Sequence, residues 1–275
     1  MGWPLPGASA ALDADLDLIV DVAREAGQLS LEWLKKGAKA WDKSPGNVVT
    51  EADIAVNDLI ARRLRSARPD YGWLSEETRD NPADRSQRRV WVVDPIDGTG
   101  AFVRGEPGYC ISIARLEGPL PVAGALFNPL TNEMFAATEG RGATLNGSRI
   151  TASPTCALGG CGMILRPEIH ARLQAHPDWP ETRLLTPMPN SIAYRIALVA
   201  AGKWDAAIGL SGTNDWDIAA AVLILEEAGG IATDGNGQAF AFNQEVTRHL
   251  GIVAAGAALH PLIMEKLQGL SRPAT

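Results

Sequence analysis

Residues 91–102 read WVVDPIDGTGAF, and this stretch places two carboxylates directly after an apolar, β-branched run. Such a run predicts a buried strand, and Asp94 follows it at once. Pro95 cannot donate a ladder hydrogen bond, and Gly98 allows backbone angles that other residues resist. The chain must therefore bend sharply here, and the bend can direct the carboxylates of Asp94 and Asp97 toward one point.

The same motif has two interpretations. Asp and Gly are common turn formers, so an isolated DPxDG is equally consistent with a simple turn. However, two unpaired carboxylates at the end of an apolar strand repel each other, and a cation is the simplest remedy. The backbone carbonyl of Ile96 could join them, and clustered oxygen ligands suit Mg²⁺ or Ca²⁺ better than Zn²⁺.

Three other acidic stretches are candidates for the same site. Glu76 and Glu77 in LSEET could be a solvated loop pair, and Asp53 in VVTEAD could be an ordinary acid in the first turn of a helix. Asp217 in TNDWDIAAAVLIL begins a helix with an apolar body. Asp215 is the better predicted N-cap, which leaves Asp217 without an obvious structural task. The same helix N-terminus would also favour a bound phosphate.

Composition limits the classes of function. A formal net charge of −7 argues against general nucleic-acid binding. It still permits a small phosphorylated substrate, because bound cations reverse the local field. Three cysteines without a CxxC predict neither a disulfide framework nor a thiolate metal site, and they fit a reducing compartment. No signal peptide and no membrane span are recognised, so a cytoplasmic location is expected.

The predicted elements indicate an α/β protein with two parts. Helices are expected over 9–36, 51–66, 167–175, 191–201, 216–228 and 256–269. Strands at 89–93, 109–116, 121–127 and 133–138, joined by short turns, predict an antiparallel sheet in a subdomain of residues 1–150 that carries most metal ligands. Alternating strands and helices predict a mainly parallel sheet in a subdomain of residues 151–275, which carries Asp217 and substrate contacts.

Taken together, VVTEAD, LSEE, DPIDGTGAF, GRGATLNG and NDWDIAAA…EEAGG resemble the inositol monophosphatase family of Mg²⁺-dependent, lithium-sensitive phosphatases. The resemblance implies a layered α/β/α/β/α sandwich, usually dimeric, that holds two or three Mg²⁺ ions. It implies metal ligation by Glu76, Asp94, the carbonyl of Ile96, Asp97 and Asp217. It also implies that Asp53, Thr99 and Glu76 help activate water, that Glu77 supports them, and that the N–H groups of Gly98 and Thr99 bind phosphate.

The chain departs from the inositol-hydrolysing members. Gly100-Ala101 replaces the Thr-Asn that often follows DGT, and Leu210 stands where those members have a substrate-binding Glu. Ser191 and Arg195 in SIAYRIALVAAG resemble the substrate-binding segment of the 3'(2'),5'-bisphosphate nucleotidase branch, where a basic residue would suit a second phosphate.

Adenosine 3',5'-bisphosphate is therefore the preferred hypothesis for the substrate. Inositol 1-phosphate, another sugar phosphate or histidinol phosphate is the alternative. A catalytically silent binding protein on the same fold is an alternative of another class, but all the carboxylates are retained. A haloacid-dehalogenase mechanism is excluded, because Pro95 stands where that class needs its nucleophilic Asp.

Overall fold

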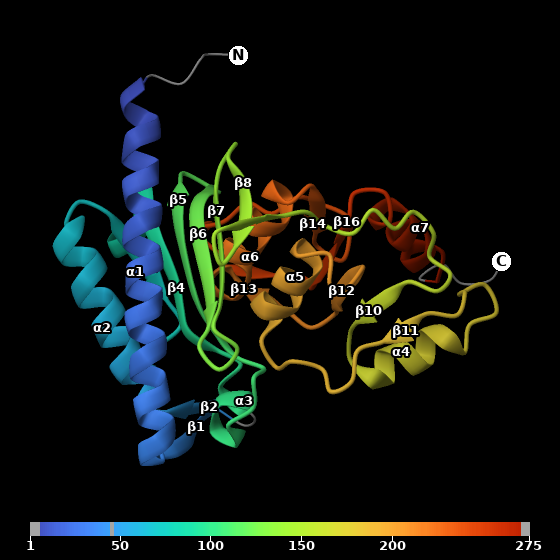
Figure 1. Cartoon of the computed structure of the whole chain (residues 1–275), viewed down its shortest axis with the longest axis horizontal. Coiled ribbons are helices and arrows are strands. Elements are labelled where there is room, and N and C mark those ends of the chain that lie inside the picture. Colours follow the sequence, from blue (N-terminus) through green and yellow to red (C-terminus); the bar gives the residue numbers. More distant parts are fainter. Residues whose placement is uncertain (1–5, 45–46, 271–275) are drawn as a thin grey trace.

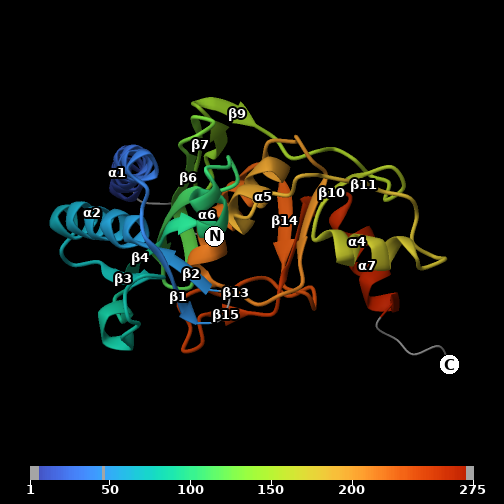
Figure 2. The same cartoon turned by 90° about the horizontal axis from the view of Figure 1, so that it is seen from below.

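The computed structural model describes residues 6–44 and 47–270 and consists of five layers (Figure 1). Two helices cover the outer face of a seven-stranded sheet, and two more helices fill the space between this sheet and a second, five-stranded one. Two further helices cover the far face of the second sheet. Figure 2 shows the layers in sequence from α1 (Pro6–Lys36) and α2 (Glu51–Ala67) to α4 (Pro167–Gln174) and α7 (His260–Leu270). This is the α/β/α/β/α sandwich that the sequence predicted.

Six of the seven α-helices in the described residues lie close to their predicted ranges. Their bounds are α1 Pro6–Lys36, α2 Glu51–Ala67, α3 Thr99–Arg104, α4 Pro167–Gln174, α5 Ile192–Ala200, α6 Asp215–Glu227 and α7 His260–Leu270. Thr50 caps α2, since its hydroxyl accepts the N–H of Ala52. The short helix α3 was not predicted, because its TGAFVR sequence spans too little chain to show a helical period.

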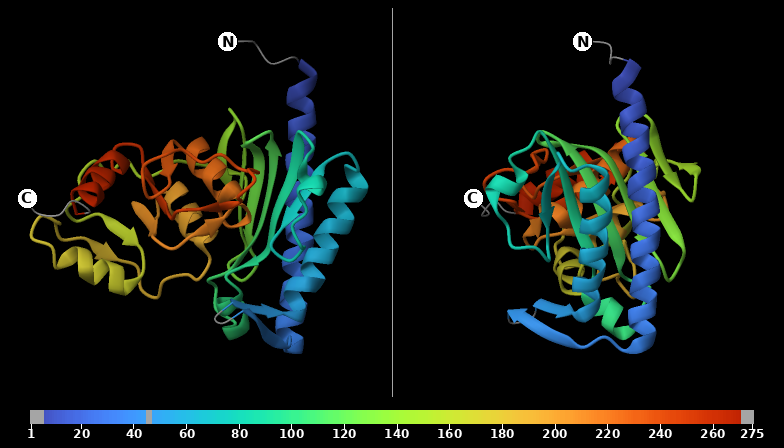
Figure 3. Two further views of the ribbon diagram at one scale, coloured as in Figure 1. Left: turned by 180° about the vertical axis from the view of Figure 1, so that it is seen from behind. Right: turned by 90° about the vertical axis from the view of Figure 1, so that its left-hand side faces the viewer.

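The first sheet has the order β3-β4-β5-β6-β7-β8-β9. Its strands are β3 Gly72–Ser75, β4 Arg89–Asp97, β5 Cys110–Glu117, β6 Leu120–Asn128, β7 Glu133–Thr138, β8 Gly142–Leu145 and β9 Ser148–Ile150. All pairs are antiparallel, as expected, except β3 with β4, which run parallel. Helix α1 runs along the outer face of this sheet (Figure 3).

The second sheet has the order β11-β10-β12-β16-β14. Its strands are β10 Gly162–Ile164, β11 Arg183–Leu184, β12 Ala206–Gly209, β14 Gly230–Thr233 and β16 Ile252–Gly256. Strand β10 pairs in parallel with β11 and β12, whereas β16 pairs antiparallel with β12 and β14. The prediction of a mainly parallel sheet is therefore wrong for the β16 half. A long loop, instead of a helix, connects β14 to β16, so this connection reverses the chain direction.

Two short antiparallel strand pairs complete the fold. Strand β1 (Ala40–Ser44) pairs with β2 (Asn47–Thr50), and β13 (Thr213–Asn214) pairs with β15 (Arg248–His249). Strands β2 and β13 each lead directly into a helix whose first turn carries a predicted site residue, Asp53 in α2 and Asp217 in α6.

The buried apolar side chains of the described residues form three cores. Ile19, Ile60 and Trp91 belong to the core under α1 and α2, and Leu126, Ala197 and Ile224 to the central core around α5 and α6. The third core joins the second sheet to α4 and α7. Helix α6 is apolar all round because it lies between two sheets, which explains its AAAVLIL body.

Candidate active site

Strand β4 ends in an irregularity that places the two motif aspartates. Asp94 pairs with Ser112 and Asp97 with Cys110, so three steps on β4 face two on β5. Such a bulge bends the strand and redirects its side chains. Asp94 is buried, and its Oδ1 accepts the N–H of Ile96 at 3.0 Å. The predicted bend is present, and both carboxylates line one pocket.

The N-terminal end of α5 holds Asp97. The Ser191 hydroxyl donates to Asp97 Oδ2 at 2.5 Å, and the N–H of Ala193 donates to the same oxygen at 2.8 Å. Ser191 is fully buried and also accepts the N–H of Tyr194 as the N-cap of α5. Ser191 was predicted to contact the substrate. Its buried position instead favours a role in holding the carboxylate of Asp97.

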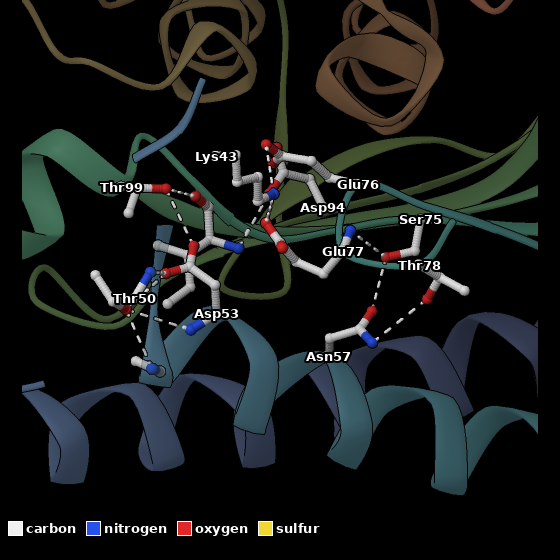
Figure 4. A network of polar contacts seen from close by, with 12 residues as sticks. Lys43, Thr50, Asp53, Asn57, Ser75, Glu76, Glu77, Thr78, Asp94 and Thr99 are labelled. Atoms are coloured by element: carbon white, nitrogen blue, oxygen red, sulfur yellow. Dashed lines mark hydrogen bonds and ion pairs between the residues drawn. The ribbon is translucent and has the colours of Figure 1, made fainter. Parts of the chain in front are cut away.

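The side chains of Asp53 and Thr99 face each other beside the end of β4 (Figure 4). Asp53 Oδ2 accepts the N–H of Thr50 at 2.8 Å and its hydroxyl at 2.6 Å, so this oxygen is fully occupied by the cap of α2. Asp53 Oδ1 instead faces the hydroxyl of Thr99, 3.1 Å away. The same hydroxyl lies 3.2 Å from the carbonyl oxygen of Ile96. Thr99 therefore connects Asp53 to the bend of β4.

Glu76 and Glu77 follow β3 and lie beside the end of β4. The N–H of Glu76 donates to the Val93 carbonyl at 3.2 Å, which anchors its backbone. Figure 4 shows Lys43, from β1, with its ammonium group between the two glutamates. Lys43 Nζ lies 3.5 Å from Glu76 Oε1 and pairs closely with Glu77. Lys43 was not predicted, because a lysine in a turn-rich loop carries no signal of its own.

Helix α6 brings Asp217 to the site from the other half of the chain. Asn214 is the N-cap, and Asp217 Oδ2 accepts its N–H at 2.6 Å. The prediction of Asp215 as the cap is wrong. Asp215 is the first helical residue, and its buried carboxylate accepts the N–H of Asn243 and lies 2.7 Å from His249 Nε2. Asp217 thus also has a structural task that was not predicted, because its carboxylate helps to cap the N-terminus of α6.

Two adjoining pockets open at this place. The first has a volume of about 260 Å³ and is lined by Val48, Glu76, Asp94, Ile96, Asp97, Gly98, Thr99, Gly100, Asn190 and Asp217. The second, of about 210 Å³, shares Asp97, Asn190 and Asp217 with it and adds Arg166, Arg195 and Leu210. One end of the combined cavity is thus acidic and the other carries two arginines. Arg166 and Asn190 were not predicted, since neither lies in a recognisable motif.

Burial and mutual repulsion disturb the titration of these carboxyl groups. Burial, together with the charges of Glu76, Asp97 and Asp217, raises the pKa of Asp94 well above its ordinary value. Burial and the charge of Asp97 raise the pKa of Asp217 to about 8. Burial raises the pKa of Asp97 to about 6, although Ser191 and Ala193 oppose the shift. Uncharged forms are thus favoured where carboxylates crowd together without a counter-charge.

Divalent cations fit this set of donors. The pocket is lined by four carboxylate side chains, whose oxygens are ligands of hard cations, and positive charge there would remove the repulsion that raises the pKa values. Within residues 6–44 and 47–270, however, no three His, Cys, Asp or Glu side chains converge closely enough to enclose an ion as they stand. Glu76 turns toward Lys43 and Asp97 toward α5. Ion binding would therefore require some of these side chains to turn.

Comparison with known proteins supports one family. The sequence model of the inositol monophosphatase family matches residues 12–272. The chain is 34% identical to a protein named Nus factor SuhB from Xylella fastidiosa, over 81% of this chain and 82% of that protein. It is 33% identical to an inositol-1-monophosphatase of Mesorhizobium japonicum (87% and 96% covered) and 31% identical to a histidinol-phosphatase of Chlorobaculum parvum (89% and 93% covered).

A solved structure has the same fold over nearly the whole chain. The extragenic suppressor protein suhB of Bartonella henselae superimposes with a TM-score of 0.81 at 28% identity, covering 93% of this chain and 98% of that one. In the part of the chain that the structure describes, no helix is long and apolar enough to cross a membrane.

Proposed function

Because the chain belongs to the inositol monophosphatase family, whose members are phosphatases, we propose that it is a Mg²⁺-dependent phosphomonoesterase that hydrolyses a small phosphorylated metabolite with activated water. One observation carries the proposal. Glu76, Asp94, Asp97 and Asp217 come from three separate elements and line a single pocket. The carbonyl of Ile96 would complete the ligand set for two or three Mg²⁺ ions.

Bound Mg²⁺ would supply positive charge to the phosphate oxygens and lower the pKa of a coordinated water. The protein's own groups would handle the proton. The Thr99 hydroxyl donates to Asp53 Oδ1, so Thr99 can accept a proton from water as it passes its own to Asp53. Burial raises the pKa of Asp53, which improves Asp53 as a proton acceptor. Lys43 would steady Glu76 and Glu77 from outside.

The substrate's phosphate would sit over the bend of β4. Gly98 has a left-handed conformation (φ 95°), which turns the chain into α3 and allows the N–H groups of Gly98 and Thr99 to face a phosphate. Glu77 would support the ligand shell without touching the substrate, since its carboxylate is engaged by Lys43.

For the substrate, we prefer adenosine 3',5'-bisphosphate over inositol 1-phosphate. Support comes from the second pocket, where the guanidinium of Arg195 is held by the carbonyl oxygens of Pro189 (2.6 Å) and Asn190 (2.7 Å). Arg195 and Arg166 line that pocket together, so a second phosphate would find two positive charges there. Leu210 offers no carboxylate to sugar hydroxyls and is about half exposed.

Relatives that carry the names of inositol and histidinol phosphatases make those two phosphate esters the second candidates. Phosphate release should be compared for the three substrates at equal concentration, with Mg²⁺ and with EDTA. Release from none of them with Mg²⁺ would argue for the silent binding protein. Faster turnover of inositol 1-phosphate or histidinol phosphate would reject only the nucleotide preference.

From the family we also propose that the protein forms a homodimer, lies in the cytoplasm and is inhibited by Li⁺. Li⁺ could replace one Mg²⁺ without matching its charge. Phosphate release in the presence of Li⁺ and the mass of the particle in solution are direct measurements of the inhibition and of the homodimer.

A further inference from the structure

Arg85 is a buried arginine outside the pocket, at the end of the 3-10 turn η1 (Pro82–Arg85) that connects β3 to β4. Its Nε and Nη2 donate to the two carboxylate oxygens of Asp80, at 2.7 and 3.0 Å. Its Nη1 reaches a distant loop, where it donates to Asn243 Oδ1 at 3.2 Å and to the Gln244 carbonyl at 2.8 Å. Such a planar fork fixes direction as well as distance.

The loop that Arg85 holds, residues 243–249, fixes the first turn of α6. The N–H of Asn243 donates to Asp215 Oδ2 at 2.6 Å, and His249 Nε2 lies 2.7 Å from Asp215 Oδ1. The N–H of Asp215 donates to the Thr247 carbonyl at 2.9 Å. Asp215 is fully buried and stands two residues before Asp217. The contacts therefore form an unbroken path from η1 to the start of α6.

This path joins the two halves of the candidate metal site. The turn η1 lies between the strand that precedes Glu76 and the strand that carries Asp94, whereas α6 carries Asp217 from the far end of the chain. We propose that Arg85 is a positioning residue that holds the loop 243–249 and thereby sets Asp217 against Glu76 and Asp94. The proposal rests on the proposed function only in treating these carboxylates as metal ligands.

Removal of the guanidinium leaves no charge buried without a partner, because the side chain of Asp80 is 39% exposed and can be hydrated. Arg85→Gln should therefore fold. Supporting groups around metal ligands commonly change metal affinity by about 10–100-fold. We expect metal-free Arg85→Gln to bind Mn²⁺ more weakly by a factor in this range, measured by calorimetry. It should need correspondingly more Mg²⁺ for half-maximal phosphate release, with kcat at saturating Mg²⁺ close to that of the unaltered protein.

A second readout needs neither metal nor activity. Hydrogen exchange of the metal-free protein should speed up at the amides of Asn243 and Asp215, which depend on the loop. Arg63→Gln is the matched control, since Arg63 pairs with Glu25 on the surface and does not touch the loop. Arg85→Lys should be intermediate in Mn²⁺ affinity, because a lysine can reach the carbonyls but cannot form the fork to Asp80.

A lower melting temperature of Arg85→Gln with unchanged Mn²⁺ affinity and unchanged exchange in the loop would overturn the proposal, because the role would then be only structural. If Arg85→Gln does not fold, Arg85→Lys decides, since it keeps the positive charge but loses the fork to Asp80 that fixes the direction of the contact with the loop. Unchanged Mn²⁺ affinity of Arg85→Lys would also overturn the proposal. An unaltered protein that releases no phosphate would reject the proposed function instead, and the exchange experiment would still test the link from Arg85 to α6.

Discussion

The hydroxyl of Thr99 lies 3.1 Å from Asp53 Oδ1, although the two residues are 46 positions apart. Thr50 occupies the other carboxylate oxygen of Asp53, Oδ2, with its N–H and its hydroxyl. Oδ1 therefore remains available to Thr99. A hydroxyl between a buried carboxylate and an open pocket is placed to relay a proton.

Thr99→Ala should lower kcat by about 10²–10⁴-fold at saturating Mg²⁺, the usual contribution of a positioned acid–base group. Thr99→Ser keeps the hydroxyl and should retain most of the rate. Steady-state phosphate release by the two variants measures the difference. Equal rates for the Ala and Ser variants would show that this hydroxyl takes no part in proton transfer.

Asp97→Asn should reduce phosphate release by at least about a hundredfold. Altering a group that only supports a metal ligand already costs about 10–100-fold, and Asp97 is proposed as a ligand itself. The fold should survive, because the amide oxygen of Asn can still accept from Ser191 and Ala193. Circular dichroism checks the fold and a phosphate assay the rate. Normal turnover by this variant would refute the assignment of Asp97 as a metal ligand.

The stability of the metal-free protein should depend on pH through Asp217. Its pKa in the folded protein is about 8, against an ordinary value of 3.8. The folded state therefore binds more protons than the unfolded state between these values, so the free energy of unfolding falls as pH rises through this window. Melting temperatures in EDTA should be lower at pH 8 than at pH 6, and Mg²⁺ should restore stability most at pH 8.

Asp217→Asn removes this group, so its melting temperature in EDTA should change less with pH and respond less to Mg²⁺. Asp58→Asn, at an exposed position of α2, is the control and should behave like the unaltered protein. If the melting temperature of Asp217→Asn in EDTA depended on pH as strongly as that of the unaltered protein, another titrating group would be responsible.

Gly98→Ala should destabilise the protein more than Gly105→Ala. Both glycines have positive φ, 95° and 66°, so both substitutions introduce backbone strain of about 1–3 kcal/mol. At Gly98 a Cβ would also lie 2.8 Å from the Ser191 nitrogen and 2.9 Å from the Gly108 carbonyl oxygen, whereas at Gly105 nothing lies within 4 Å. Denaturant unfolding measures the free energy of unfolding of both variants. Equal decreases would show that the neighbouring backbone at Gly98 moves to make room for the Cβ.

Arg195→Met should discriminate between the candidate substrates. Loss of a charge-assisted contact costs about 1.5–3 kcal/mol, which corresponds to roughly a 10–100-fold loss in kcat/KM for a bisphosphate. Inositol 1-phosphate, which has one phosphate, should be affected much less. Leu210→Glu should shift the preference toward inositol 1-phosphate. A uniform loss for both substrates in Arg195→Met would indicate an effect on Asp97 in place of substrate recognition.

Most helices could be predicted from the sequence because they depend on local signals, whereas the order of the layers was implied by the resemblance to the family. The strand before Asp94, the Thr50 cap and the apolar body of α6 each express a short-range preference that residues a few positions apart reveal. The family motifs likewise identified the carboxylates that line the pocket. Strand direction was less predictable: β16 runs antiparallel to its neighbours because of a long loop whose path no periodicity encodes.

The sequence by itself determined which oxygen-bearing side chains are available for the proposed cation site and most of the helices and strands that carry them. Only the tertiary structure decided that Lys43 stands beside Glu76, that Ser191 is buried against Asp97, and that Arg85 reaches the loop before Asp215. The physical reason is that these contacts join residues far apart in the chain. Their distances are set by the packing of layers, which leaves no trace in the spacing of neighbouring residues.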